Sequence, residues 1–298
     1  MGLFVSMRPF LSVFLFVLVD PYSAYAAGHD WMSKISEKTL ISSLNIPGTH
    51  NSGALREPFP GTAKCQTLSL GQQLEAGVRF FDIRCRHHSN RFAIYHGPVS
   101  QKLTFDTVLE IMRVFLKKNS REFLILSIKE EHRSSETTRS FPETLHSYIK
   151  KEPLLWYTDE DIPKIAEVRG KLVLLRRFNS LKPLGIPATD WGHNGSHVGK
   201  KIFVQDRFSL TDVKTKWKTI ELAFKQSRKN PKFDRLHLHF TSGYTQSLLG
   251  IPNITAISEP INERLKAYLK TAPKRRHGSI VLDFITPELS QGIYQLNF

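Results

Sequence analysis

Cysteine is scarce in this chain, with two residues in 298. Two cysteines exclude a disulfide framework and a four-cysteine zinc site. No long apolar run follows the N-terminal segment, which excludes a multi-span membrane protein. Acidic residues are also few, 27 against 42 Lys and Arg, so the formal net charge is +15. With 40% hydrophobic residues and ordinary glycine and proline content, the chain is long enough to bury a full core, and it is neither disordered nor collagen-like.

The first 26 residues have the pattern of a secretory signal peptide. Arg8 precedes an apolar stretch at 9–19, and a small-residue cleavage site ends at Ala26. The alternative, a transmembrane anchor, needs about 20 apolar residues, and Asp20 interrupts this run earlier. We therefore expect a secreted, extracellular protein in which residues 27–298 form one catalytic domain. Secretion permits a disulfide between Cys65 and Cys85, but the sequence does not show whether the two thiols meet.

Short apolar runs alternate with helical patterns along the chain. We expect helices over 104–119, 211–229 and 258–270, and strands over eight runs: 40–46, 78–85, 91–96, 122–129, 171–178, 201–208, 236–242 and 279–285. Strands separated by helices favour a parallel sheet. Only the 86–90 connection is too short for a crossover helix, so the second and third runs are expected to pair irregularly. The pattern predicts an α/β fold, a distorted (βα)8 TIM-type barrel in a single domain.

Polar residues stand at the ends of seven of these strand runs. They are His50, Arg84, His96, Lys129, Arg177, Asp206 and Asp283. Each alone is explained by the return of polarity at a strand end. Together they predict a site, because the carboxyl ends of barrel strands converge on one mouth.

The residue types in this set suit cleavage of a phosphate diester. His50 and His96 can serve as general base and general acid near neutral pH. Arg84 provides a permanent cation whose fork of donors matches phosphate oxygens. Asp283 could orient one histidine. The remaining three residues, Lys129, Arg177 and Asp206, suit a sugar or cyclitol.

Other histidines give weaker signals. The pair His87-His88 and the cluster around His193 and His197 lack the ligand spacing of a metal site. His237 and His239 alternate with leucines along one strand run, which leaves a barrel-lining and a structural interpretation open.

The ordered series of motifs resembles the X-domain of phosphatidylinositol-specific phospholipases C, particularly the small secreted bacterial-type enzymes. The motifs are IPGTHNSG (46–53), FDIR (81–84), YHGP (95–98), SIK (127–129), LLRR (174–177), VQD (204–206) and LD (282–283). The resemblance runs from about residue 36 to the C-terminus and implies a distorted β/α barrel.

The resemblance also implies residue roles. His50 would take the proton from the inositol 2-hydroxyl, His96 would protonate the departing diacylglycerol oxygen, and Asp283 would hold His50 in its working tautomer. Arg84 would replace the calcium of the larger eukaryotic relatives, so no metal and no cofactor are expected. Lys129, Arg177 and Asp206 match residues that bind inositol hydroxyls. The products would be inositol 1,2-cyclic phosphate and diacylglycerol.

Two positions depart from the family pattern. Asn51 stands where many relatives have an aspartate that neighbours the arginine and supports the acid, and an amide lacks that charge. We expect reduced activity. Phe208 stands where the bacterial enzymes often have a tyrosine that lies against the inositol ring. Phenylalanine keeps the apolar face and loses the hydroxyl.

The leading hypothesis is a metal-independent, monomeric lyase that acts on phosphatidylinositol, or on glycosylphosphatidylinositol (GPI) anchors, at a membrane surface. The +15 charge favours peripheral attraction to anionic lipids. The loop 58–60 and the stretch 248–251 are candidate insertion points or ordinary loop and core residues. No concentrated basic stripe indicates nucleic acid. The alternative is an inositol-phospholipid binding protein with weak or lost turnover because of Asn51.

Overall fold

A parallel sheet organises the molecule, which a computed structural model describes over residues 28–247 and 250–298. Its strands lie side by side in the order β7 (Leu172–Arg177), β5 (Leu124–Glu130), β2 (Phe80–His88), β1 (Ile46–Thr49), β14 (Ser279–Leu282), β11 (Leu236–Phe240) and β10 (Ile202–Asp206). All neighbouring pairs in this series are parallel. The carboxyl ends of these strands therefore meet at one edge of the curled sheet.

Short strands flank this series and leave it open. At one margin, the short strands β6 (Trp156–Tyr157) and β8 (Ile186–Pro187) each pair in parallel with β7. At the other margin, β9 (Gly195–Val198) pairs antiparallel with β10. In the described part of the chain, no strand pairing joins these two margins. The predicted α/β fold, a distorted barrel in a single domain, is confirmed.

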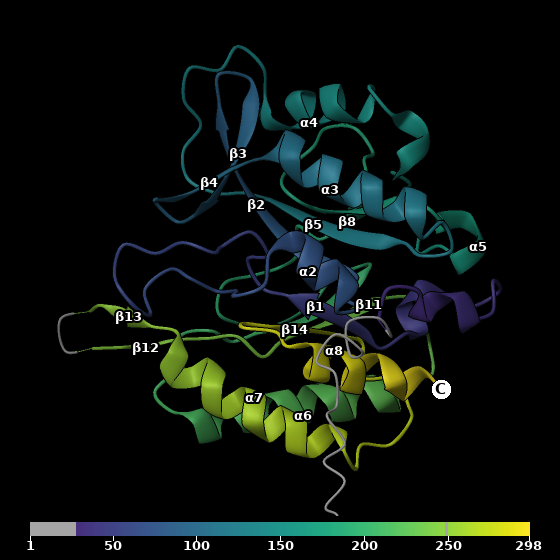
Figure 1. The fold of residues 1–298 in the computed structure, drawn as a ribbon, viewed down its shortest axis with the longest axis vertical. Helices are drawn as coiled ribbons and strands as arrows, with labels where there is room; N and C mark the ends of the chain where they lie inside the picture. Colours follow the sequence, from purple (N-terminus) through teal and green to yellow (C-terminus); the bar gives the residue numbers. More distant parts are fainter. Residues whose placement is uncertain (1–27, 248–249) are drawn as a thin grey trace, which may run out of the picture.

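Helices cover the sheet on its outer face (Figure 1). Figure 1 shows α3 and α4 on one side and α6, α7 and α8 on the opposite side. The helical segments are η1 (Trp31–Lys34), η2 (Ile41–Ser43), α2 (Leu70–Glu75), α3 (Phe105–Lys118), α4 (Phe141–Ile149), η3 (Pro153–Leu155), α5 (Ile165–Val168), α6 (Val213–Lys229), α7 (Thr255–Leu269), α8 (Pro287–Tyr294) and η4 (Gln295–Asn297). The three helices expected over 104–119, 211–229 and 258–270 are confirmed as α3, α6 and α7. Side-chain caps fix two of their starts, Thr104 for α3 and Asp212 for α6.

Strand alternation divides the apolar residues into two cores. Ile125, Val173 and Val204 belong to an inner cluster enclosed by the sheet. Leu126 and Leu174, one residue further along their strands, belong to an outer cluster packed against the helices. Because successive strand residues face opposite sides, β2, β5, β7 and β14 each supply residues to both cores.

Two expected strands differ from the structure. The run 40–46 begins as the 3-10 turn η2, and β1 starts only at Ile46. The run 91–96 is β3 (Arg91–His96), which pairs antiparallel with β2 and with β4 (Val99–Thr104) as a ribbon outside the parallel series. The irregular pairing expected from the short 86–90 connection is therefore confirmed. A further hairpin joins β12 (Thr245–Gln246) to β13 (Pro252–Asn253).

The expected signal peptide, 1–26, and part of the expected insertion stretch, Leu248 and Leu249, lie outside the described residues. Cys65 and Cys85 are buried free thiols, so the possible disulfide between them is not formed. No helix in the described ranges has the length and apolar character to cross a bilayer.

Candidate active site

The polar residues of the site continue the inward-facing alternation of the strands. On β2, Asp82 and Arg84 follow Phe80 of the inner core at two-residue steps. On β5, Lys129 follows Ile125 by four residues. Because the side-chain period is two, the inward face of β2 and of β5 is apolar in the inner core and polar at the carboxyl end of the strand.

A pocket of about 360 Å³ lies at this edge. All seven strand-end residues line it: His50, Arg84, His96, Lys129, Arg177, Asp206 and Asp283. Phe208 also lines it, whereas Asn51 is fully buried beside His50 and is not among the lining residues. The fold thus brings together groups that are up to 233 residues apart, as in the pair of His50 and Asp283.

His50 is held between an anion and a cation. Its Nδ1 lies 2.7 Å from Oδ1 of Asp283, and its Nε2 lies 2.8 Å from Nη2 of Arg84. A guanidinium only donates hydrogen bonds, so Nε2 must accept and the ring proton must reside on Nδ1. This is the tautomer of a histidine whose Nε2 is ready to accept a proton.

Asp82 organises the cations of the pocket, although it was not among the predicted site residues. Its Oδ2 accepts from Nε of Arg84 at 3.0 Å, and its Oδ1 accepts from Nη1 of Arg177 at 3.0 Å. Burial alone would raise the pKa of Asp82, but Arg84 and Arg177 lower it well below its usual range. The signal that could have found Asp82 is its inward position, two residues before Arg84.

His96 comes from the β2–β3–β4 ribbon rather than from the parallel sheet. Its ring centroid lies 6.2 Å from that of His50, and its Nδ1 lies 2.7 Å from the carbonyl oxygen of Ala63. Nδ1 must donate to that carbonyl, which leaves Nε2 as the exchangeable nitrogen. Burial and the nearby Arg84 cation lower the pKa of His96 to about 4.

Lys129 is paired with Glu131, a second residue that was not among the predicted site residues. Nζ of Lys129 donates to Oε2 of Glu131 at 2.7 Å. Oε1 of Glu131 accepts from the backbone of Gly97 at 3.0 Å and lies 3.6 Å from Arg84. Burial alone would raise the pKa of Glu131, but Arg84 and Lys129 lower it to about 2. Glu131 therefore links the His96 turn to the cations of the sheet.

Aromatic side chains line part of the pocket, and one of them bonds to Asp206. The indole of Trp191 donates to Oδ2 of Asp206 at 3.1 Å, and the Arg177 guanidinium lies 3.4 Å from the Trp191 ring centroid. Phe208 and Tyr244 are tilted neighbours with centroids 6.1 Å apart. Trp191 and Tyr244 come from loops, so no strand periodicity marked them in the sequence. A flat apolar surface beside several hydrogen-bonding groups suits a polyhydroxylated ring.

Asn51 makes no side-chain hydrogen bond in the structure, although it is fully buried. Its backbone is in the left-handed region, with φ at 44°, and its N–H donates to Oδ2 of Asp82 at 3.1 Å. An amide oxygen can accept a hydrogen bond as the relatives' aspartate would. The Asn51 amide forms none with Arg84 or His96.

His193 lies in the pocket, whereas His237 and His239 lie outside it. His193 lines the pocket, with its ring 5.0 Å from that of Phe208. His237 and His239 face outwards from β11 toward α6, where both ring systems contact the hydroxyl of Ser227 at 2.7 Å. The barrel-lining interpretation of His237 and His239 was therefore wrong, and the structural interpretation holds.

Comparisons with known proteins give a consistent result. The family model described as phosphatidylinositol-specific phospholipase C, X domain, matches residues 28–178. A 1-phosphatidylinositol phosphodiesterase of Listeria monocytogenes is 32% identical, over 90% of this chain and 84% of the relative. The solved phosphatidylinositol-specific phospholipase C of the same organism has a TM-score of 0.73 at 28% identity, covering 91% of this chain and 99% of that one. A Staphylococcus aureus enzyme of that name, solved in work on its membrane binding, has a TM-score of 0.81 at 25% identity, covering 92% and 99%.

Proposed function

This chain belongs to the phosphatidylinositol-specific phospholipase C X-domain family, and we propose that it cleaves phosphatidylinositol to inositol 1,2-cyclic phosphate and diacylglycerol. The observation that carries this proposal is the meeting of His50, His96 and Arg84 in one pocket. A base, an acid and a phosphate-binding cation within reach of one phosphorus atom are what an internal displacement requires.

The first step uses His50 as the base. Nε2 of His50 takes the proton of the inositol 2-hydroxyl, and the 2-oxygen attacks the neighbouring phosphorus. Asp283 stabilises the imidazolium that forms, because its carboxylate already accepts from Nδ1 at 2.7 Å. An attacking hydroxyl on the substrate itself avoids the entropy cost of capturing water, an advantage worth several kcal/mol.

The second half of the reaction uses His96 as the acid. In its imidazolium form, which the bound phosphate anion favours, His96 gives its Nε2 proton to the diacylglycerol oxygen as the phosphorus–oxygen bond breaks. Arg84 donates to the nonbridging phosphate oxygens, and this cation serves where larger relatives use calcium. The step leaves His50 protonated and His96 neutral. In hydrolysis of the cyclic ester, His96 takes a proton from water and His50 gives its proton to the inositol 2-oxygen. Both histidines then return to their starting protonation states.

The other predicted pocket residues would bind the inositol ring. Lys129, Arg177 and Asp206 supply donors and acceptors to ring hydroxyls, and Phe208 supplies a flat apolar face. Phosphatidylinositol and GPI anchors share this headgroup, so both are proposed substrate classes.

Membrane contact is proposed at the mouth of the pocket. Phe59 is 71% exposed and Ile251 is 50% exposed, each on a loop. A hydrogen bond from Ile254 to the carbonyl of Gly61 at 2.9 Å joins the two loops, and Ile254 itself lines the pocket. Insertion of these apolar tips would place the mouth against the lipid headgroups. The proposed place of action is the outside of a membrane, after secretion.

The test is an assay of the purified protein on phosphatidylinositol vesicles in excess chelator, with phosphorus NMR detecting the cyclic product. We expect product from the native chain, and losses of at least about 10³-fold in His50→Ala and His96→Ala. His88→Ala is the matched control, because His88 is exposed on β2 outside the pocket. A requirement for calcium would overturn the role of Arg84.

The alternative function, an inositol-phospholipid binding protein, has one observation in its favour. Asn51 carries no charge and its amide is buried without a hydrogen-bond partner, so it gives His96 none of the support that the family resemblance attributes to an aspartate. Vesicle binding without cyclic product from the native chain would favour the binding protein over the lyase.

A further inference from the structure

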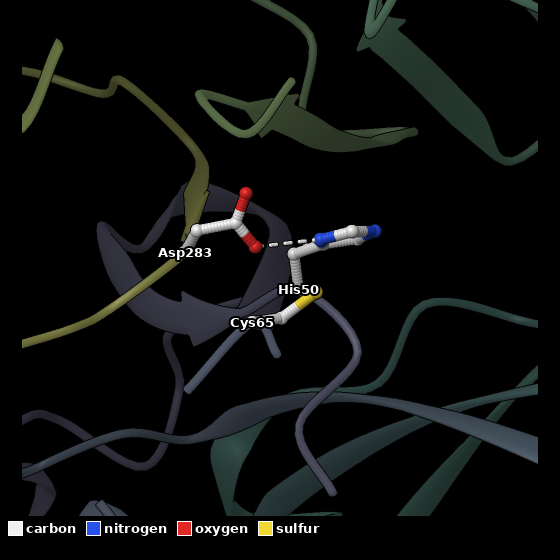
Figure 2. A group of neighbouring side chains, drawn as sticks. All are labelled: His50, Cys65 and Asp283. Carbon is white, nitrogen blue, oxygen red and sulfur yellow. Dashed lines mark hydrogen bonds and ion pairs between the residues drawn. The ribbon is translucent and has the colours of Figure 1, made fainter. Parts of the chain in front are cut away.

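Cys65 lies beside the proposed catalytic pair although the reaction has no use for a thiol. The side chain is fully buried, and its sulfur belongs to a compact group with His50 and Asp283 (Figure 2). One ligand atom from each of the three residues lies within 4.8 Å of the others. The backbone fixes this arrangement, because Phe284 donates to the carbonyl of Cys65 at 2.7 Å and thereby ties the thiol to the residue after Asp283.

One oxygen of this group has no partner. Oδ1 of Asp283 is bonded to His50, but Oδ2 is buried and makes no hydrogen bond. Asp283 as a whole is 1% exposed. A buried carboxylate oxygen without a donor is costly, and a cation at this position would satisfy it.

The donor set has a clear chemical preference. A thiolate, an imidazole nitrogen and a carboxylate oxygen are the three ligand types that bind Zn²⁺, and three protein ligands leave one coordination position open. The soft sulfur also favours Cd²⁺ and disfavours Mg²⁺ and Ca²⁺, which prefer sets composed of oxygen. His50 and Asp283 both line the pocket, which gives a cation a route to the group.

We propose that His50, Cys65 and Asp283 form a binding site for a thiophilic divalent cation such as Zn²⁺ or Cd²⁺, and that its occupation inhibits the enzyme. The inhibitory part rests on the proposed function, in which His50 is the base. The binding part rests on the side-chain cluster alone.

Proton accounting explains why the cation inhibits. Binding breaks the S–H bond of Cys65 and releases that proton to water, while bonds form from the cation to sulfur, to Nδ1 of His50 and to a carboxylate oxygen of Asp283. Nδ1 can bind the cation only as a bare nitrogen, so the ring proton moves to Nε2. Nε2 then carries a proton and cannot take one from the substrate. The proton on Nε2 also faces Nη2 of Arg84, a hydrogen-bond donor 2.8 Å away.

The experiment compares the two cysteines of the chain. Protein purified in chelator and exchanged into metal-free buffer receives Zn²⁺, Mg²⁺ or Ca²⁺ in the phosphatidylinositol assay. A parallel ultraviolet titration with Cd²⁺ detects the cadmium–thiolate absorption. The variants are Cys65→Ala and Cys65→Ser, each referred to its own metal-free rate. Cys85→Ala is the control, because Cys85 is also a buried free thiol but does not belong to the group formed by His50, Cys65 and Asp283.

We expect Zn²⁺ to inhibit the native chain and Cys85→Ala, and Mg²⁺ and Ca²⁺ to have no such effect. Loss of the sulfur ligand should weaken Zn²⁺ inhibition by about 100-fold or more. The cadmium–thiolate band should appear with one equivalent of Cd²⁺ in the native chain and be absent from both Cys65 variants. Serine keeps the volume of the side chain if alanine impairs folding.

Two results would overturn the proposal. One is Zn²⁺ inhibition of equal strength in folded Cys65→Ala or Cys65→Ser, and the other is no cadmium–thiolate band in the native chain. If the native chain has no lyase activity, the proposed function fails, yet the Cd²⁺ titration still decides whether the site exists.

Discussion

Nη2 of Arg84 lies 2.8 Å from Nε2 of His50, so the cation that should bind phosphate covers the nitrogen that should act as base. This contact is a hydrogen bond from a permanent donor to a neutral imidazole. A phosphate anion competes for the same guanidinium, because charge-assisted bonds to phosphate oxygens are stronger than a bond to a neutral nitrogen. Substrate binding would therefore free Nε2 at the moment when the base is needed.

Arg84→Lys tests whether the guanidinium fork, rather than the charge, is required. Lysine keeps the positive charge but cannot bond to phosphate and Asp82 with a planar set of donors. We expect kcat to fall by about 10² to 10³, the usual effect of removing one donor to a developing negative charge. Steady-state kinetics in chelator measure the change. Arg86→Lys, two residues along β2 and outside the pocket, is the control. A rate within threefold of the native value would show that charge alone suffices.

Asn51→Asp should raise turnover by up to about tenfold, which corresponds to about 1.4 kcal/mol of transition-state stabilisation. The new carboxylate adds a negative charge next to His50 and, through the backbone, next to Asp82. This negative charge opposes the lowering of the His96 pKa by Arg84. The same buried carboxylate should lower Tm, because the amide that it replaces has no hydrogen-bonding partner.

The control for this substitution is Asn51→Gly, which fits the left-handed backbone and carries no charge. Its turnover should not rise. An unchanged or lower rate in a folded Asn51→Asp variant would contradict the charge argument.

His96 should titrate differently in the free and the ligand-bound protein. Burial and Arg84 hold its pKa at about 4, so the free imidazole is neutral at pH 7. A general acid must carry a proton, and an anionic phosphate beside it favours the imidazolium. NMR titration of the histidine ring protons should therefore show the pKa of His96 rising when inositol phosphate binds. His277, whose pKa burial also lowers to about 4, lies outside the pocket and should not respond. A ligand-bound His96 that still titrates near 4 would remove it as the acid.

The seven strand-end residues could be predicted because the return of polarity at the end of an apolar run is readable from the sequence. Arg84 and Lys129 stand an even number of positions after inner-core residues of their strands, so their direction follows from the period of two. Asp82 obeys the same period but sits before the strand end, and a rule confined to strand ends misses it.

Residues brought in by loops were beyond sequence reasoning. Trp191 reaches Asp206 from the segment between β8 and β9, and Cys65 reaches Asp283 across more than 200 residues of chain. Loops have no fixed side-chain period, so neither contact could be derived from spacing. The place of His96 in the pocket also depended on tertiary packing, because its strand, β3, lies on an antiparallel ribbon outside the parallel series.

A buried histidine group between β11, α6 and α7 links stability to pH. His237 and His239 share the hydroxyl of Ser227, and Nε2 of His277 lies 2.8 Å from the hydroxyl of Tyr268. Burial, together with nearby arginines, lowers the pKa of His237 and of His277 to about 4. The pKa of His239 is also lowered by burial. All three rings are therefore neutral in the folded protein at mildly acidic pH.

The folded protein should lose stability as the pH falls from about 6.5 toward 4. In that window the unfolded chain binds protons that the folded chain does not, so the free energy of unfolding decreases with falling pH. At pH 5, a histidine with a folded pKa of about 4 and an unfolded pKa of about 6.5 costs about 2 kcal/mol relative to pH 7.5. Urea unfolding at the two pH values measures this loss. His277→Gln keeps a polar side chain of similar size that does not titrate. It should reduce the difference in unfolding free energy between the two pH values by about 2 kcal/mol. His88→Gln, at an exposed position, should leave that difference unchanged. Equal pH dependence in the native chain and His277→Gln would show that the acid sensitivity originates elsewhere.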